Sequence, residues 1–94
     1  GNMAESGRQE GIVGVLMERF EKHRLPRILA IKEHVDQGQR LREIDLDFLE
    51  QVLQDAKQNM PLIDGVPECQ SLFARVVHLY NEIAEKALAN EKRA

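Results

Sequence analysis

The apolar positions of the C-terminal third of the chain recur at the spacing of an α-helix. When successive residues are placed about 100° apart, the apolar side chains from Pro67 to Asn90 fall within one arc of roughly 180°. They are Leu79, Leu72, Ile83, Val76, Cys69, Ala87, Tyr80, Phe73, Ala84, Val77 and Leu88. A helix with a single packing partner usually shows a stripe of about 100°. We therefore predict a helix that contacts two elements, or one element and a second subunit.

A second helical pattern covers the N-terminal third. From Ile12 onward the apolar side chains keep to one arc of about 120°, even when the count continues straight through Pro26. They are Val13, Leu16, Met17, Phe20, Ile28, Ile31 and Val35. Because a break would normally reset this phase, we predict one helix from Gln9 to Gln37, kinked where Pro26 removes a backbone donor. The alternative is two helices with Pro26 opening the second, which would make a four-helix bundle.

Turn-forming and capping residues separate these patterns from a shorter helix between them. Gly38 is expected to end the first helix in a left-handed conformation. Asp45 is expected to cap a helix over 46–58, and Ile44 to pack on Leu49 across that cap. The apolar face of this helix is Leu46, Phe48, Leu49, Val52, Leu53, Ala56 and Met60.

The connector after the short helix begins at Pro61 and ends at Val66. Its Asp64-Gly65 pair predicts a turn, and Leu62 and Ile63 are expected to close one end of the core. We therefore predict one all-α domain over residues 1–94, an antiparallel three-helix bundle. Gly1 and Asn2 look like a cloning remnant, and residues 1–8 are expected to be disordered or derived from cloning.

The predicted helix lengths suggest self-association. At 1.5 Å per residue the first and last helices would run to about 40 and about 36 Å, but the middle helix only to about 20 Å. Part of the long helices would therefore face water unless a second copy covers it. The predicted homodimer interface, equally open to another protein, is Ile12, Val13, Leu16, Met17, Phe20, Val77, Tyr80, Ala84 and Leu88. The alternative is a monomer whose N-terminal residues fold back as a short helix.

Charge is distributed unevenly along the chain. The net charge is −3, yet residues 19–42 carry seven basic and three acidic side chains, and residues 45–66 carry one basic and five acidic ones. Arg24, Arg27, Arg40 and Arg42 form the candidate contact for an anion or nucleic acid. Acidic residues Asp45 and Asp47 at the start of the next helix would face phosphate, which disfavours nucleic-acid binding.

Residue spacing gives no support to catalysis or metal binding. The three histidines, His23, His34 and His78, lack the i, i+4 pairing of a helical zinc site. His78 faces Glu82 one turn away, and we expect an exposed pair there rather than a ligand set. Cys69, the single cysteine, lies in the first turn of the last helix, where it is expected to be buried in the core.

The sequence accordingly predicts a small interaction or adaptor protein that acts by binding, with no catalytic residue, metal or cofactor. The longest purely apolar run, residues 28–31, is too short to cross a membrane, and no secretory signal is visible. Together with the single cysteine, this favours the cytoplasm. The alternative function is a nucleic-acid accessory protein that uses the basic region between Arg19 and Arg42.

Overall fold

The computed structural model of the chain is helical throughout its regular elements. It describes the backbone of residues 2–93 and the side chains of residues 11–62 and 64–92. Within residues 2–93 no strand is formed. The elements in chain order are α1 (Asn2–Arg19), the π-helical turn η1 (Phe20–Arg24), α2 (Leu25–Asp36), α3 (Glu43–Gln58), α4 (Met60–Ile63) and α5 (Pro67–Arg93).

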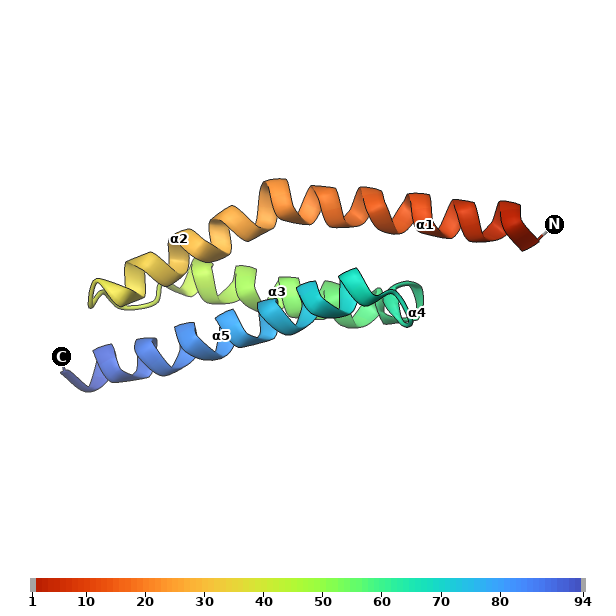
Figure 1. The fold of residues 1–94 in the computed structure, drawn as a ribbon. Helices are drawn as coiled ribbons and strands as arrows, with labels where there is room; N and C mark the ends of the chain where they lie inside the picture. The colour runs from red at the N-terminus through yellow and green to blue at the C-terminus, as the bar shows by residue number, and fades with distance from the viewer. Residues whose placement is uncertain (1, 94) are drawn as a thin grey trace.

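The first three elements form one continuous helix, as the phase of the apolar pattern predicts. The irregularity precedes the proline: the N–H of Leu25 donates to the carbonyl oxygen of Phe20, five residues back. Pro26 has no N–H, and its ring crowds the carbonyl four residues before it. A wider π-helical turn relieves both problems without breaking the helix. Figure 1 shows the helix axis changing direction at this turn.

The π-helical turn also changes which side chains reach the core. A straight α-helical count would place Leu25 about 120° from Val13, outside the predicted apolar stripe. The extra residue in η1 rotates the side chains that follow it back toward the apolar stripe. Leu25 therefore reaches the core and is only 9% exposed. It joins Ile28, Ile31 and Val35 in the core.

The connector between α2 and α3 confirms one predicted cap and corrects another. Gly38 has φ +91°, its N–H donates to Val35 O, and the N–H of Gln39 donates to His34 O. This is the Schellman arrangement, and the predicted glycine cap is confirmed. The predicted cap at Asp45 is wrong, because α3 begins at Glu43 after an extended Arg42. Ile44 is then 63% exposed rather than packed across a cap.

The connector between α3 and α5 contains one helical turn. The predicted turn at Asp64-Gly65 is confirmed, since Gly65 has φ +84°, a conformation that favours glycine. In α4 the N–H of Asp64 donates to Met60 O. Leu62 is half-buried, whereas the side chain of Ile63, expected at the same end of the core, lies outside the described residues.

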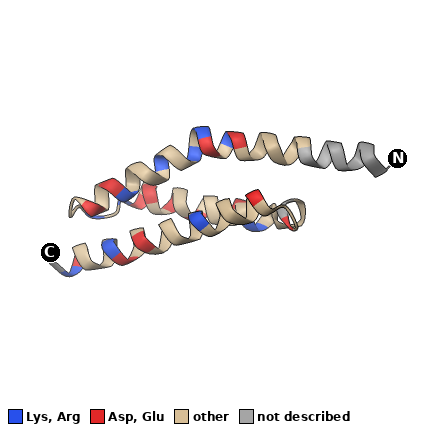
Figure 2. Ribbon diagram, in the orientation of Figure 1, with Lys and Arg blue, Asp and Glu red and all other residues tan. Residues whose placement is uncertain are grey.

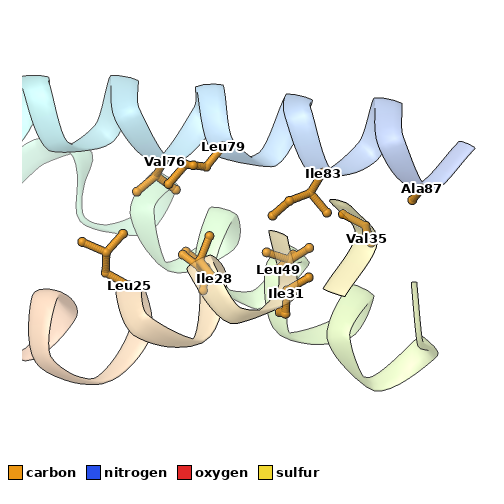
Figure 3. Close-up of a cluster of buried hydrophobic side chains, with 10 residues drawn as sticks. Leu25, Ile28, Ile31, Val35, Leu49, Val76, Leu79, Ile83 and Ala87 are labelled. Atoms are coloured by element: carbon orange, nitrogen blue, oxygen red, sulfur yellow. The ribbon is translucent and has the colours of Figure 1, made fainter. Parts of the chain in front are cut away.

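The core lies between α2, α3 and α5. Figure 3 shows the side chains of α2 and α5 pointing toward one another, with Leu49 of α3 beside Ile31. Ile28, Ile83 and Val35 are at most 1% exposed. The complete cluster is Leu25, Ile28, Ile31, Val35, Leu49, Val52, Val76, Leu79, Ile83 and Ala87.

A buried amide joins α5 to the end of α2. Asn90 is 3% exposed, and its Nδ2 donates to Val35 O and Gln39 O, both at 2.8 Å. The sequence pattern placed Asn90 only at the end of the last helix. In the structure it supplies donors to two carbonyl oxygens around the Gly38 cap.

The molecule is elongated because α1 continues past the other helices. The Cα atoms have extents of 60 × 19 × 18 Å and a radius of gyration of 15.8 Å, against about 12 Å for a compact chain of this length. Figure 1 shows α1 passing α4 and ending beyond it, so α1 is not folded back as a separate short helix. None of the described helices combines the length and apolarity needed to cross a membrane.

Candidate interaction surfaces

The predicted interface residues of the first helix lie on two different faces of α1. Val13 is 4% exposed, so it packs within the chain and offers nothing to a partner. Leu16, Met17 and Phe20 are half-buried. Ile12 is 52% exposed and points away from that packed face. The predicted contact of Val13 with a second subunit is therefore wrong, and this part of the interface divides into an inner and an outer set.

The outer set continues with a residue that the sequence pattern left out. Val15 is 50% exposed, and a hollow on the surface of α1 is lined by Gly11, Ile12, Val15, Leu16 and Arg19. We call these five residues the α1 outer face. Ile12, Val15, Leu16 and Arg19 follow the i, i+3, i+4, i+7 spacing of one helix side. Counting positions around the helix from Ile12 would have found Val15.

The α1 outer face is uncharged over most of its length and open to close approach. No charged residue occurs from Gly11 to Met17, and Figure 2 shows this segment of α1 as an unbroken tan stretch. A Cβ atom built on Gly11 or on Gly14 meets nothing within 4 Å. The backbone of another helix can therefore come near α1 here.

The predicted interface residues of α5 do not extend this surface. Tyr80 is half-buried and packs against the core cluster, and Val77 and Ala84 are also half-buried. Leu88 is 60% exposed, but it lies toward the C-terminus, at the end of the molecule opposite the N-terminal part of α1 (Figure 1). The structure therefore does not bring the two predicted halves of the interface together.

A second surface is an apolar groove on the inner side of the bend at η1. Its volume is about 100 Å³. It is lined by Leu16, Met17, Phe20, Val52, Ala56, Asn59, Cys69, Leu72, Phe73 and Val76. We call it the η1 groove, because Phe20 begins that turn.

The predicted burial of Cys69 is confirmed at 3% exposure. Burial, and secondarily the charge of Glu68, raises the pKa of its thiol above the ordinary value, which disfavours the reactive thiolate.

Polar side chains surround one end of the η1 groove. An adjoining hollow of about 310 Å³ is lined by Leu16, Arg19, Phe20, His23, Arg24, Asp55, Gln58 and Asn59. We call it the polar mouth. Arg24 and Asp55 form an ion pair with Nη2 and Oδ2 2.6 Å apart. The hydrogen bond from Arg24, followed by that from Gln51, lowers the pKa of Asp55 below its ordinary value.

The four arginines predicted to contact an anion do not form one cluster of free charges. Arg24 pairs with Asp55, and the guanidinium of Arg27 lies 4.0 Å from the ring centroid of Phe48. Arg42 donates from Nε and Nη2 to the carboxylate of Asp45, whose side chain is 2% exposed. Arg40 is exposed in the connector. Three of the four are thus engaged within the chain, which weakens the case for phosphate binding by the basic region between Arg19 and Arg42.

The described histidines and acidic residues do not assemble a metal site. His78 Nε2 lies 2.6 Å from Glu82, and Glu82 also lies 3.5 Å from Lys32 Nζ, so this exposed pair belongs to a polar surface network between α2 and α5. Within the described part of the chain, no group of three or more His, Cys, Asp or Glu side chains is placed to hold a metal ion.

Comparison with known proteins leaves these two surfaces, the α1 outer face and the η1 groove, as the basis for assigning a function. The chain matches no protein-family model, no curated protein and no solved structure.

Proposed function

We propose that the chain is a small cytoplasmic interaction protein that forms a homodimer through the α1 outer face and acts by binding rather than by catalysis. Its body is an antiparallel three-helix bundle of α2, α3 and α5, from which α1 projects as the dimerisation helix. Support comes from one observation above the others. Ile12 and Val15 are each about half exposed, at 52% and 50%, side by side on an uncharged segment of α1.

A second copy is the occupant that suits this surface. The exposed apolar residues lie on one helix side beside Gly11, which allows a neighbouring helix to approach closely. In a twofold dimer the same surface serves both partners, so a single contact covers Ile12 and Val15 of both copies. Pairing two α1 helices in opposite directions would keep the two bundles apart, at the two ends of the assembly.

The test is molar mass by light scattering on a sizing column, at several protein concentrations and at low and high salt. We expect a dimer whose mass falls on dilution, because the contact is small, but does not fall at high salt, because the contact is apolar. The double variant Ile12→Lys/Val15→Lys should be monomeric and should keep the helical circular dichroism and melting temperature of the monomer fold.

The matched control is Ile44→Lys. Ile44 is 63% exposed on α3, so it receives the same substitution at an equally accessible helical position away from α1. We expect this variant to remain dimeric. A wild-type monomer at high protein concentration, or a dimer that persists in the double variant, would contradict the proposed interface.

A further inference from the structure

The η1 groove and the polar mouth form one continuous hollow. They share Leu16, Phe20 and Asn59 in their linings. The groove is apolar apart from Asn59 and the Cys69 thiol and has a volume of about 100 Å³, whereas the mouth has a volume of about 310 Å³ and carries charged groups. A ligand that fills both must therefore have an apolar part and a polar end.

The polar end faces an excess of positive charge. Arg19 and Arg24 line the mouth against one carboxylate, that of Asp55, and His23 adds an imidazole. Asp55 is already bound to Arg24 at 2.6 Å. Arg19 forms no ion pair with any of the described side chains, and it lies one helical turn before His23. The guanidinium of Arg19 is therefore the cation available to a ligand at this mouth.

We propose that this hollow binds a free medium-chain carboxylate, with its alkyl tail in the η1 groove and its carboxylate at Arg19. Leu72, Phe73 and Val76 of α5 form one wall for the tail, and Val52 and Ala56 of α3 form another. The groove volume of about 100 Å³ suits a short alkyl tail. Arg24 stays with Asp55, and the amide of Asn59 lies between the apolar and polar parts.

The test compares three amphiphiles with the same eight-carbon tail: octanoate, 1-octanol and octyltrimethylammonium. Affinities are measured by calorimetry, and the site is mapped by amide chemical shifts. We expect octanoate to bind about tenfold more tightly than octanol, and octyltrimethylammonium to bind more weakly still. Shifts should concentrate at Leu16, Phe20, Cys69 and Leu72.

Two variants separate the roles of the two parts of the hollow. Arg19→Gln should reduce the affinity for octanoate to that for octanol and leave the affinity for octanol unchanged. The control is Arg40→Gln, the same substitution in the distant connector between α2 and α3, and it should change neither affinity. Ala56→Leu should fill the groove and weaken both ligands at least tenfold, with folding verified by its melting temperature. Equal binding of the three amphiphiles, an unaffected Arg19→Gln variant, or shifts outside the hollow would overturn the proposal.

The two proposals share Leu16 and Arg19, which line both the α1 outer face and the polar mouth, but Ile12 and Val15 line neither the groove nor the mouth. The Ile12→Lys/Val15→Lys variant changes the outward side of α1, so it should bind octanoate as the wild type does. If octanoate affinity falls in that variant, the α1 outer face rather than the groove is the binding surface, and the proposal is overturned.

Discussion

At the scale of single residues, Asn90 has the most distinctive environment. An asparagine near the end of a helix usually faces water, yet this side chain is 3% exposed and holds two carbonyl oxygens of a segment more than fifty residues away in sequence. Its Oδ1 has no hydrogen-bond partner among the described residues. The orientation of the amide follows from the two carbonyl acceptors, because only Nδ2 can donate to them.

Replacement of Asn90 should therefore be costly. In Asn90→Ala, Val35 O loses one of its donors and the side-chain donor to Gln39 O is lost, so we expect a loss of about 2 kcal/mol in the free energy of unfolding and of about 10 °C in melting temperature. Asn90→Asp should be worse at neutral pH, because a buried carboxylate would face two carbonyl oxygens.

The pH dependence of Asn90→Asp distinguishes this mechanism from general disruption. Burial raises the pKa of the introduced acid in the folded state. As pH rises, the acid therefore loses its proton in the unfolded state before it does so in the folded state, and the free energy of unfolding falls with increasing pH. Urea unfolding at pH 3 and pH 7 should show a deficit relative to wild type that is smaller at pH 3. Asn81→Asp, at an exposed position of α5, is the control and should show little deficit at either pH. Equal deficits for Asn90→Asp at both pH values would contradict this account.

At the scale of elements, the π-helical turn η1 positions the η1 groove and the polar mouth. It begins with Phe20, which lines the η1 groove, and it carries His23 and Arg24 at the polar mouth. Its connection to α3 is the ion pair between Arg24 and Asp55, whose side chains are 38% and 27% exposed. An ion pair this accessible contributes little to stability, but it ties the bend in the first helix to a neighbouring element.

This ion pair gives a pH-dependent prediction. The pKa of Asp55 is lowered below 3.8 in the folded protein, mainly by its hydrogen bond from Arg24. A lowered folded-state pKa means that the stabilisation is complete above the unfolded-state pKa and is lost as pH falls through the folded-state value. Arg24→Gln should cost about 0.5–1 kcal/mol in the free energy of unfolding at pH 7, measured by urea denaturation, and almost nothing near pH 2.

The control for the ion pair is Lys22→Gln, two residues before Arg24 in the same π-helical turn. Lys22 pairs with Glu18 at 2.6 Å, but both side chains are more than 60% exposed. Its replacement should change stability by less than about 0.5 kcal/mol at either pH. A deficit of Arg24→Gln that stays constant from pH 7 to pH 2 would show that Asp55 is not the partner that matters.

At the scale of the whole molecule, shape is the property that carries the proposed function. A radius of gyration of 15.8 Å in so short a chain reflects the N-terminal end of α1, which continues past α4 (Figure 1). Ile12 and Val15 on the outer side of α1 are open to a second copy, whereas the core of α2, α3 and α5 is closed within one chain.

Small-angle X-ray scattering tests this shape directly. The Ile12→Lys/Val15→Lys variant should scatter as a rod with a maximum dimension close to the 60 Å length of one chain, allowing for its hydration layer. The wild type should give about twice the forward scattering and a longer maximum dimension, because pairing through α1 places the two bundles at opposite ends. A wild-type particle no longer than the variant would contradict this arrangement of α1.

Particular residues show where sequence reasoning succeeded and failed. The periodic apolar positions identified the helices and most of the core, and Gly38 and Gly65 marked turns through a conformation that few other residues adopt. Leu25 was missed because a straight α-helical count cannot include a π-helical turn. Asp45 was misassigned as a cap because its partner, Arg42, precedes the helix and pairs with its carboxylate.

The candidate surfaces were predicted less well, for a related reason. Periodicity reports which side chains avoid water, but not whether the same chain or a second copy covers them. Val13 and Ile12 are neighbours in sequence and similar in character, yet one is buried within the chain and the other is half exposed. The hollow that joins Arg19 and Arg24 to an apolar groove became recognisable only when α1, η1, α3 and α5 were placed together.

The sequence by itself determined the all-helical character, the continuity of the first helix through Pro26 and the glycine turns, because these depend on local periodicity and backbone conformation. The tertiary structure decided which face of α1 is left open, how Asn90 joins α5 to α2, and that an apolar groove meets a cationic mouth at η1. These features depend on contacts between residues distant in sequence, and such contacts are set by how the helices pack rather than by any one helix.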